Sequence, residues 1–226
     1  MRVGFKIQFV PHVGYTSASI YGLKKESPVA RPNCPKCHYP LKACLCESIE
    51  LMRVSTELIV LQDPSEVGHA KNSVRLLSLV ISETRVLVGE GPDDFAELRQ
   101  YLDASTKPVY LVYPSDKSKN AEEERFDDEV ILLLLDGTWR KAYKLLQLNP
   151  WLLQYPSLHL DLQSGSNYTI RKASRSDSLS TLEAAAMMLK AIDPKMSVTP
   201  LTRALSAMVN QRLNSMPASV RKRYES

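Results

Sequence analysis

The chain has 226 residues, of which 44% are hydrophobic and 24% are charged, a balance that excludes a fibrous or largely disordered protein. This length is enough for one large domain, or for one domain with a small appendage. The longest apolar run, Val130 to Leu135, is far too short to cross a bilayer, and the N-terminus lacks the pattern of a secretory signal peptide. We therefore expect a cytoplasmic protein without a membrane-spanning segment.

The formal net charge of +4 is modest, but the charges are unevenly distributed. Lysine and arginine outnumber the acidic residues in 1–46 and again after residue 202, whereas acidic residues concentrate in 116–129. Basic ends around an acidic middle are compatible with a polyanionic partner such as RNA. The same pattern is typical of a solvated surface with mobile tails, so charge alone does not identify a partner.

Residues 1–30 have weak periodicity and are assigned only as an N-terminal arm. The next segment, 31–50, contains the four cysteines of the chain, which are Cys34, Cys37, Cys44 and Cys46. Their spacing, C-x2-C-x6-C-x-C, offers four soft thiolates for a closed tetrahedral zinc site, with an iron–sulfur cluster as the main rival. Disulfides are not expected in a cytosolic chain. Zinc would stabilise this small segment, and its basic flanks could contact RNA phosphates.

From residue 51 onward, short apolar runs alternate with amphipathic stretches. Strands are predicted at 57–61, 85–88, 108–112, 129–135 and 158–160. Helices are predicted at 71–82, 93–102, 139–148, 181–192 and 203–213. This alternation predicts an α/β domain with a mostly parallel sheet over 51–215, followed by a basic tail over 216–226. The stretch 116–128 is interpreted as a charged surface excursion.

Ligands of parallel α/β sheets bind beyond the carboxyl ends of the strands. This rule selects four loops, which are 62–71, 113–118, 136–139 and 163–180. Each contains small or polar residues that packing does not require. Function is therefore expected in these loops.

The first of these loops leads into a helix with an apolar arc formed by Val74, Leu76, Leu77, Val80 and Ile81. Lys71 and Arg75 fall on a narrow polar strip of the same helix. The strip is either the solvated face of a half-buried helix or, with Asn72, a site that meets substrate phosphate or base. His69 is expected to be a surface residue, and His38 in the cysteine segment a bystander.

The segment Asp136-Gly137-Thr138-Trp139 follows a continuous apolar run, which is typical of a strand buried on both faces. Gly137 permits a tight turn, and Thr138 suits the N-cap of the next helix. Trp139, on one helix face with Tyr143, is expected to be a core anchor rather than a ligand contact. Asp136 stands in the expected binding crevice, so a functional role is favoured over a capping role.

Two further positions lie near the last predicted loop. Arg171, in a stretch rich in serine and asparagine, has three possible partners: a ligand carboxylate held bidentately, a phosphate, or a surface carboxylate. Ser180 and Glu183 have the spacing of a capping box, and helix capping is favoured over ligand contact for both.

The turn Asp136-Gly137-Thr138-Trp139, with Arg140-Lys141-Ala142 after it, resembles the signature of the DTW-domain family. Similar segments stand in the family's order around it: the cysteine cluster, LQDPSEVGHAKNSVRLL, Tyr113-Pro114-Ser115, Tyr168-Thr169-Ile170-Arg171-Lys172 and Leu179-Ser180-Thr181-Leu182-Glu183-Ala184. The resemblance covers roughly residues 31–192. It departs from the family pattern at Ser73, where a threonine is expected, and at Asp63, where a histidine is common.

The resemblance implies a SPOUT-like knotted α/β domain and the activity of a tRNA-uridine aminocarboxypropyltransferase. Such enzymes transfer the 3-amino-3-carboxypropyl group of S-adenosyl-L-methionine to N3 of a tRNA uridine and release methylthioadenosine. The implied group donor is S-adenosylmethionine, and the implied partner is tRNA. The alternatives are an RNA methyltransferase of the same broad fold, a related transferase acting on rRNA, and a non-catalytic zinc-containing RNA-binding protein.

With this interpretation, cofactor binding is assigned to Leu111, Tyr113, Pro114, Ser115, Asp136, Gly137, Thr138, Trp139, Leu179, Ser180 and Thr181. RNA binding is assigned to Lys71, Asn72, Arg75, Arg140, Arg171 and Lys172. Backbone N–H groups of 111–115 and 179–181 are candidate donors to the adenosine. Asp136 is either the base for uridine N3 or the group that holds the cofactor's ammonium and so aims the transferred carbon. A helix that begins two residues later stabilises its carboxylate, which opposes the base role, whereas burial favours it.

Overall fold

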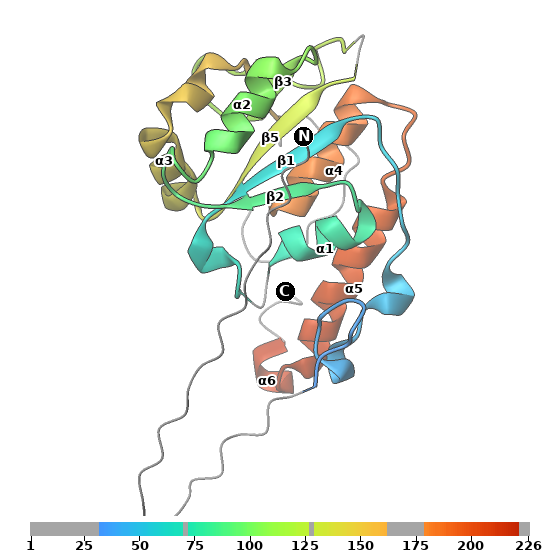
Figure 1. Ribbon diagram of the computed structural model, residues 1–226. Helices are drawn as coiled ribbons and strands as arrows, with labels where there is room; N and C mark the ends of the chain where they lie inside the picture. The colour runs from blue at the N-terminus through green and yellow to red at the C-terminus, as the bar shows by residue number, and fades with distance from the viewer. Residues whose placement is uncertain (1–31, 70–71, 127–128, 162–178, 222–226) are drawn as a thin grey trace, which may run out of the picture. The chain divides into compact units, whose positions relative to one another are not determined.

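The apolar runs identified in the sequence form one parallel sheet at the centre of the computed structural model, which describes residues 32–69, 72–126, 129–161 and 179–221 (Figure 1). Its strands are β1 (Glu57–Gln62), β2 (Arg85–Val88), β3 (Val109–Val112), β4 (Lys119–Asn120), β5 (Ile131–Asp136) and β6 (Ser157–His159). The six strands lie in the order β2-β1-β5-β3-β6-β4. The two long apolar strands, β1 and β5, are therefore neighbours in the interior of the sheet.

Helices occupy the connections between the strands and the C-terminal part of the chain. The α-helices are α1 (Ser73–Val80), α2 (Ala96–Ala104), α3 (Trp139–Leu148), α4 (Thr181–Ile192), α5 (Thr199–Ser215) and α6 (Ala218–Arg221). Short 3-10 helices are η1 (Leu41–Ala43), η2 (Cys46–Ser48), η3 (Pro64–Glu66) and η4 (Pro150–Gln154).

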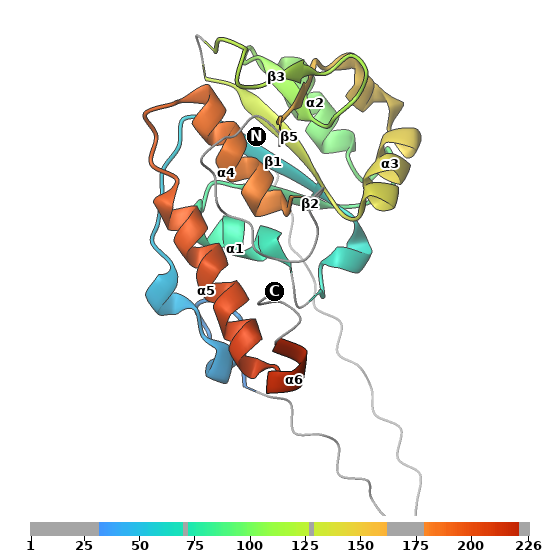
Figure 2. The same ribbon diagram turned by 180° about the vertical axis from the view of Figure 1, so that it is seen from behind.

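Each face of the sheet is covered by its own group of helices, as the two opposite views show (Figures 1 and 2). Leu58 and Val60 of β1 belong to the core formed with α1, α4 and α5, whereas Ile59 and Leu61 belong to the core formed with α2 and α3. Successive side chains of a strand point to opposite faces, so a strand in the middle layer must be apolar at every position. This requirement explains the continuous apolar runs.

The predicted α/β architecture is confirmed, and every predicted strand and helix is present. The stretch predicted as a surface excursion also contains β4, a two-residue strand too short to produce a periodic pattern. Helix α5 begins at Thr199, four residues before the predicted start, because Pro200 in its first turn is compatible with a helix N-terminus. The chain knot and the predicted domain boundaries stay predictions.

The cysteine segment belongs to the same compact unit as the sheet, Asn33–Ser226. Its Tyr39 and Leu45 are buried in the core that also contains α1, α4 and α5. None of the helices in the described part of the chain combines the length and the apolar character that a bilayer crossing requires.

Candidate functional site

A cleft of about 540 Å³ opens at the carboxyl ends of β3, β5 and β6, beside the first turns of α3 and α4. Its lining residues are Val112, Tyr113, Pro114, Leu134, Leu135, Gly137, Thr138, Trp139, Arg140, Ala142, Leu158, His159, Leu160, Leu179, Thr181 and Ala184. A mostly apolar wall with a few polar groups is typical of small-molecule sites, and the volume is within their usual range. Three of the four predicted loops contribute to this wall.

The sheet changes direction beside this cleft. The chain passes from β1 to β2 on one side and then places β3 on the other side, with β5 between β1 and β3. Such a switch point leaves a crevice at the carboxyl ends of the strands. Gln62 and Asp136, which end β1 and β5, are paired across this point.

The Asp136 carboxylate is held from two sides by other parts of the chain. Its Oδ2 accepts a hydrogen bond from Gln62 Nε2 at 2.7 Å, and its Oδ1 accepts one from Thr181 Oγ1 at 2.5 Å. The residue is only 9% exposed, so both bonds lie in a region of restricted water access. The carboxylate therefore joins β1, β5 and α4, and Asp136 lies next to Leu135, Gly137 and Thr181, which line the cleft. Gln62 begins one of the predicted loops, but no local pattern singles it out, because its contact with Asp136 depends on the register between β1 and β5.

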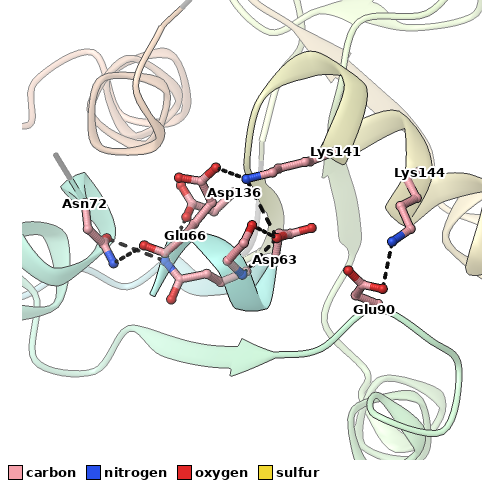
Figure 3. A network of polar contacts seen from close by, with 9 residues as sticks. Asp63, Glu66, Asn72, Glu90, Asp136, Lys141 and Lys144 are labelled. Atoms are coloured by element: carbon pink, nitrogen blue, oxygen red, sulfur yellow. Dashed lines mark hydrogen bonds and ion pairs between the residues drawn. The ribbon is translucent and has the colours of Figure 1, made fainter. Parts of the chain in front are cut away.

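A charged cross-link fixes the loop after β1 to the first turn of α3 (Figure 3). Lys141 Nζ lies 2.6 Å from Glu66 Oε1 and 3.9 Å from Asp63 Oδ1. Its hydrogen bond with Glu66 raises the pKa of Lys141. Burial alone would raise the pKa of Asp63, but hydrogen bonds from Ser65 and the charge of Lys141 outweigh burial and lower it. Opposite charges are therefore maintained on the two sides of the turn.

Gly137 is required in this turn by a close approach of neighbouring atoms. A Cβ added at Gly137 would lie 2.9 Å from the Cβ of Lys141, which belongs to the fixed part of that side chain. The turn and the helix start would have to separate to accommodate a methyl group. The predicted role of Gly137 in a tight turn therefore has a specific steric cause.

Gly137→Ala is expected to lower the free energy of unfolding by about 1–3 kcal/mol, the usual cost of overpacking a close contact, and to slow any reaction in the cleft. Thermal unfolding and a turnover assay would measure the two effects. Gly68→Ala is the matched control, because a Cβ added there meets no described atom within 4 Å. Equal behaviour of the two variants would contradict the steric explanation.

The prediction that Trp139 anchors in the core is wrong. Its side chain is 51% exposed and lines the cleft, with its ring edge-to-face to Tyr113 at a centroid distance of 6.0 Å. Helix α3 instead buries Ala142, Leu145 and Leu146 against the sheet. Tyr143, one turn after Trp139, is 58% exposed. Two aromatic residues of α3 therefore face outward beside the cleft.

Thr138 occupies the predicted N-cap position of α3, with extended backbone angles, but its side chain makes no capping hydrogen bond. At α4, by contrast, the predicted capping box is confirmed. Ser180 Oγ accepts from the Glu183 N–H at 3.3 Å, and Glu183 Oε2 accepts from the Ser180 N–H at 2.8 Å. This cap sets the first turn of α4 and so positions Thr181, the residue that donates to Asp136.

The expectation that residues 111–115 offer backbone donors to a ligand is wrong for four of the five. The N–H of Leu111 donates to Pro156 O, that of Tyr113 to Leu158 O, and that of Ser115 to Ser118 Oγ. Pro114 has no N–H group to offer. The Leu111 side chain is fully buried in the core below α2 and α3. Of this segment, Val112, Tyr113 and Pro114 line the cleft.

The predicted RNA-binding residues have different surroundings. Asn72 caps α1, because its Oδ1 accepts from the Arg75 N–H at 3.1 Å, and its Nδ2 donates to the carbonyls of Glu66 and Val67. The Arg75 guanidinium lies over the Tyr39 ring, 5.4 Å from the centroid. Arg140 is exposed and lines the cleft. The positions Lys71, Arg171 and Lys172 lie outside the described residues.

The four cysteines converge on one point. All four Sγ atoms lie within 4.8 Å of one another, with Cys34 to Cys46 at 3.6 Å and Cys37 to Cys44 at 3.8 Å. A tetrahedron with Zn–S bonds of about 2.3 Å places its sulfur atoms roughly 3.8 Å apart. Hydrogen bonds from the backbone N–H groups of Cys37 and Lys36 lower the pKa of Cys34 to about 6, whereas side-chain contacts with Cys44 and Cys34 raise the pKa of Cys46 to about 12, so the geometry of the four sulfur atoms carries the assignment. The cluster can therefore hold a metal ion.

The cysteine segment also contacts helices α1 and α5. The Tyr39 hydroxyl donates to Met208 Sδ of α5 at 3.5 Å, and the Tyr39 ring lies under Arg75 of α1. Helix α1 is connected to the cleft in turn, since Gln62 Nε2, which donates to Asp136, also lies 3.5 Å from Asn72 Oδ1 at the N-cap of α1. The cysteine segment and the buried carboxylate thus both contact helix α1.

Comparison with known proteins gives a consistent result. The model of the DTW domain family matches residues 31–213. The tRNA-uridine aminocarboxypropyltransferase 2 of Mus musculus is 30% identical over 208 residues, which cover 88% of this chain and 70% of the relative. Proteins of the same name from Drosophila melanogaster and Macaca fascicularis are 29% and 27% identical, covering 87% and 86% of this chain and 81% and 68% of the relatives. No solved structure shows significant similarity to the chain.

Proposed function

The chain belongs to the DTW domain family, and from this membership we propose that it transfers the 3-amino-3-carboxypropyl group of S-adenosylmethionine to N3 of a uridine in tRNA. The observation that carries the proposal is the family match itself, which spans both the cysteine cluster and every described residue of the cleft. The relatives named above are all called tRNA-uridine aminocarboxypropyltransferase. Their names supply the group transferred and the class of acceptor.

The cleft is assigned to S-adenosylmethionine, which supplies an activated carbon on its sulfonium. Aminocarboxypropyl transfer differs from methyl transfer in which carbon on the sulfur faces the acceptor. The site must therefore hold the amino-acid tail of the donor in a fixed orientation. The buried carboxylate of Asp136, whose chain neighbours and donor Thr181 line the cleft, suits the ammonium of that tail.

We assign this anchor role to Asp136 rather than the role of base. Gln62 and Thr181 each donate to one of its oxygens, so the carboxylate is fixed in orientation. Each oxygen keeps a second acceptor site that an ammonium can use. A group that already accepts two hydrogen bonds is better suited to hold a cation than to remove a proton.

The tRNA is assigned to the outer side of the cleft. Trp139 and Tyr143 present exposed aromatic rings there, and Arg140 is exposed beside them. Single-stranded RNA bases stack on aromatic rings, and arginine binds phosphate groups. The target uridine would thus be held by stacking at the mouth of the cleft that contains the donor.

Zinc is proposed as the metal of the four-cysteine cluster, with a structural role. The sulfur separations fit its tetrahedral geometry, and all four ligands are protein thiolates. A closed set of four leaves no open position for a substrate. The metal would therefore stabilise the segment that contacts α1 and α5.

The proposed function is tested by incubating the purified protein with unmodified tRNA and S-adenosylmethionine, followed by mass spectrometry of the nucleosides. The expected product is aminocarboxypropyluridine, with an equal amount of methylthioadenosine. A methylated nucleoside would instead indicate a methyltransferase. RNA binding without release of methylthioadenosine would indicate a non-catalytic RNA-binding protein, and product only with rRNA would change the acceptor.

Thr181→Val is expected to reduce kcat/KM by roughly 10- to 100-fold, because a hydrogen bond to a charged group contributes about 1.5–3 kcal/mol. Valine keeps the shape of threonine and removes only the donor to Asp136. The matched control is Thr202→Val on α5, whose hydroxyl donates to Thr199 O outside the cleft. Full activity of the Thr181 variant would show that Asp136 does not need this donor.

A further inference from the structure

His159 is a polar side chain of the cleft to which the proposed function gives no task. It lies at the end of β6 and lines the cleft together with Trp139 and Thr181. The short strand β4 pairs with β6 and brings the preceding residue, Ser118, beside it. Ser118 Oγ is 3.0 Å from His159 Nδ1.

The surroundings of Ser118 determine which ring nitrogen of His159 carries hydrogen. Ser118 Oγ lies 2.6 Å from Ser115 O, and a carbonyl oxygen has no hydrogen, so the single hydroxyl hydrogen of Ser118 must lie between these two atoms. The Ser115 N–H donates to the same Oγ at 2.9 Å. Because the hydroxyl hydrogen is already used, the contact with His159 requires a donor on the histidine side. Nδ1 is therefore protonated, and in the neutral ring Nε2 is the free acceptor.

We propose, on the basis of the proposed function, that Nε2 of His159 is the base that removes the N3 proton of the target uridine. Neutral imidazole is the side chain that enzymes use most often for this task. Among the described residues that line the cleft, the other ionisable side chains are Tyr113 and Arg140. Arg140 stays charged, and burial raises the pKa of Tyr113, so its phenol stays protonated. Asp136 is already engaged by two donors.

The step balances with the groups named. Nε2 of His159 takes the hydrogen of uridine N3, and the electron pair left on N3 forms a bond to the sulfonium-linked carbon of the aminocarboxypropyl group. The bond between that carbon and sulfur breaks, its electron pair stays on sulfur, and methylthioadenosine leaves. The imidazolium then returns its proton to water. Ser118 is a positioning residue in this scheme, since it holds the ring through Nδ1.

His159→Asn separates a catalytic role from a structural one. The asparagine amide can still donate to Ser118 from the position of Nδ1, but nothing replaces Nε2. The single-turnover rate of transfer should fall by about 10²–10⁴-fold, the usual contribution of a positioned base, while the affinities for S-adenosylmethionine and tRNA stay unchanged. His38→Asn is the matched control, because His38 lies in the cysteine segment and its positive φ of 57° is one that asparagine tolerates.

A substrate with a more acidic N3–H provides the second measurement. In tRNA transcribed with 5-fluorouridine, the loss caused by His159→Asn should shrink, because less help is needed to remove the proton. Added imidazole should likewise restore part of the rate of His159→Ala. A His159→Asn enzyme as fast as the wild type, or one equally slow on both tRNAs, would overturn the base role. Absence of aminocarboxypropyluridine with the wild-type protein would instead overturn the proposed function, and the base role with it.

Discussion

Asp136→Asn is expected to lower kcat/KM for aminocarboxypropyl transfer by at least about 10²–10³-fold, the usual effect of removing one electrostatic contact to the reacting groups. Asparagine has nearly the same shape, and its Oδ1 can still accept from Gln62 Nε2 while its Nδ2 donates to Thr181 Oγ1 in the reverse direction, but the negative charge is lost. In the anchor role that charge holds the ammonium of S-adenosylmethionine. The affinity for S-adenosylmethionine should therefore fall along with turnover, and calorimetry and nucleoside mass spectrometry would measure the two quantities.

The same variant distinguishes the two roles considered for Asp136. If Asp136 were the base, its loss would leave the affinity for S-adenosylmethionine unchanged, and 5-fluorouridine tRNA would recover much of the rate. Asp103→Asn, at an exposed position in α2, controls for the general effect of removing one negative charge. A variant of Asp136 with wild-type turnover would remove this residue from the mechanism.

Cys37→Ser is expected to release the metal and to destabilise the protein. Cys37 is fully buried, and its Sγ faces that of Cys44 at 3.8 Å. A ligand present at 1,000 times its Kd stabilises the folded state by about 4 kcal/mol, and a loss of that order would lower the Tm by roughly 10 °C. Elemental analysis and thermal unfolding would measure metal content and stability.

Control variants and spectra test whether the four-cysteine cluster holds zinc. His38→Asn should keep the metal, because His38 provides no ligand to the cluster. A brown protein with visible absorption would indicate an iron–sulfur cluster in place of zinc. Full metal content and an unchanged Tm in Cys37→Ser would contradict the metal site itself. Because Tyr39 connects this segment to α1 and α5, loss of metal should also reduce transfer activity.

Much of the architecture could be predicted from the sequence because it depends on local patterns. A continuous apolar run such as Val130 to Leu135 is tolerated only in a strand covered on both faces, and the structure has β5 in that place. The capping box of Ser180 and Glu183 is likewise local, because its two residues are only three positions apart in the sequence. Both features leave a pattern within a few residues of sequence, so both could be recognised before the structure was known.

The errors and omissions concern contacts that no local pattern encodes. Trp139 and Tyr143 have the spacing of a buried stripe, yet α3 is rotated so that Ala142 and Leu145 face the sheet. Gln62 can donate to Asp136 only because β1 and β5 are paired in a register that places the two residues side by side. His159 is brought to Ser118 by the pairing of β6 with β4, and β4 has only two residues, too few to produce a periodic pattern in the sequence.

The hydrogen bonds of Asp136 join segments that are far apart in the sequence, so they form at different stages of folding. One hydrogen-bond donor to its carboxylate lies 74 residues earlier in the chain, and the other lies 45 residues later. On the ribosome, β1 and β5 can pair before the residues of α4 have been synthesised. The carboxylate then has one of its two donors, and the wall of the cleft formed by α4 is missing. A nascent chain or a truncated product therefore has no complete site, and catalytic competence arises only when the C-terminal helices dock.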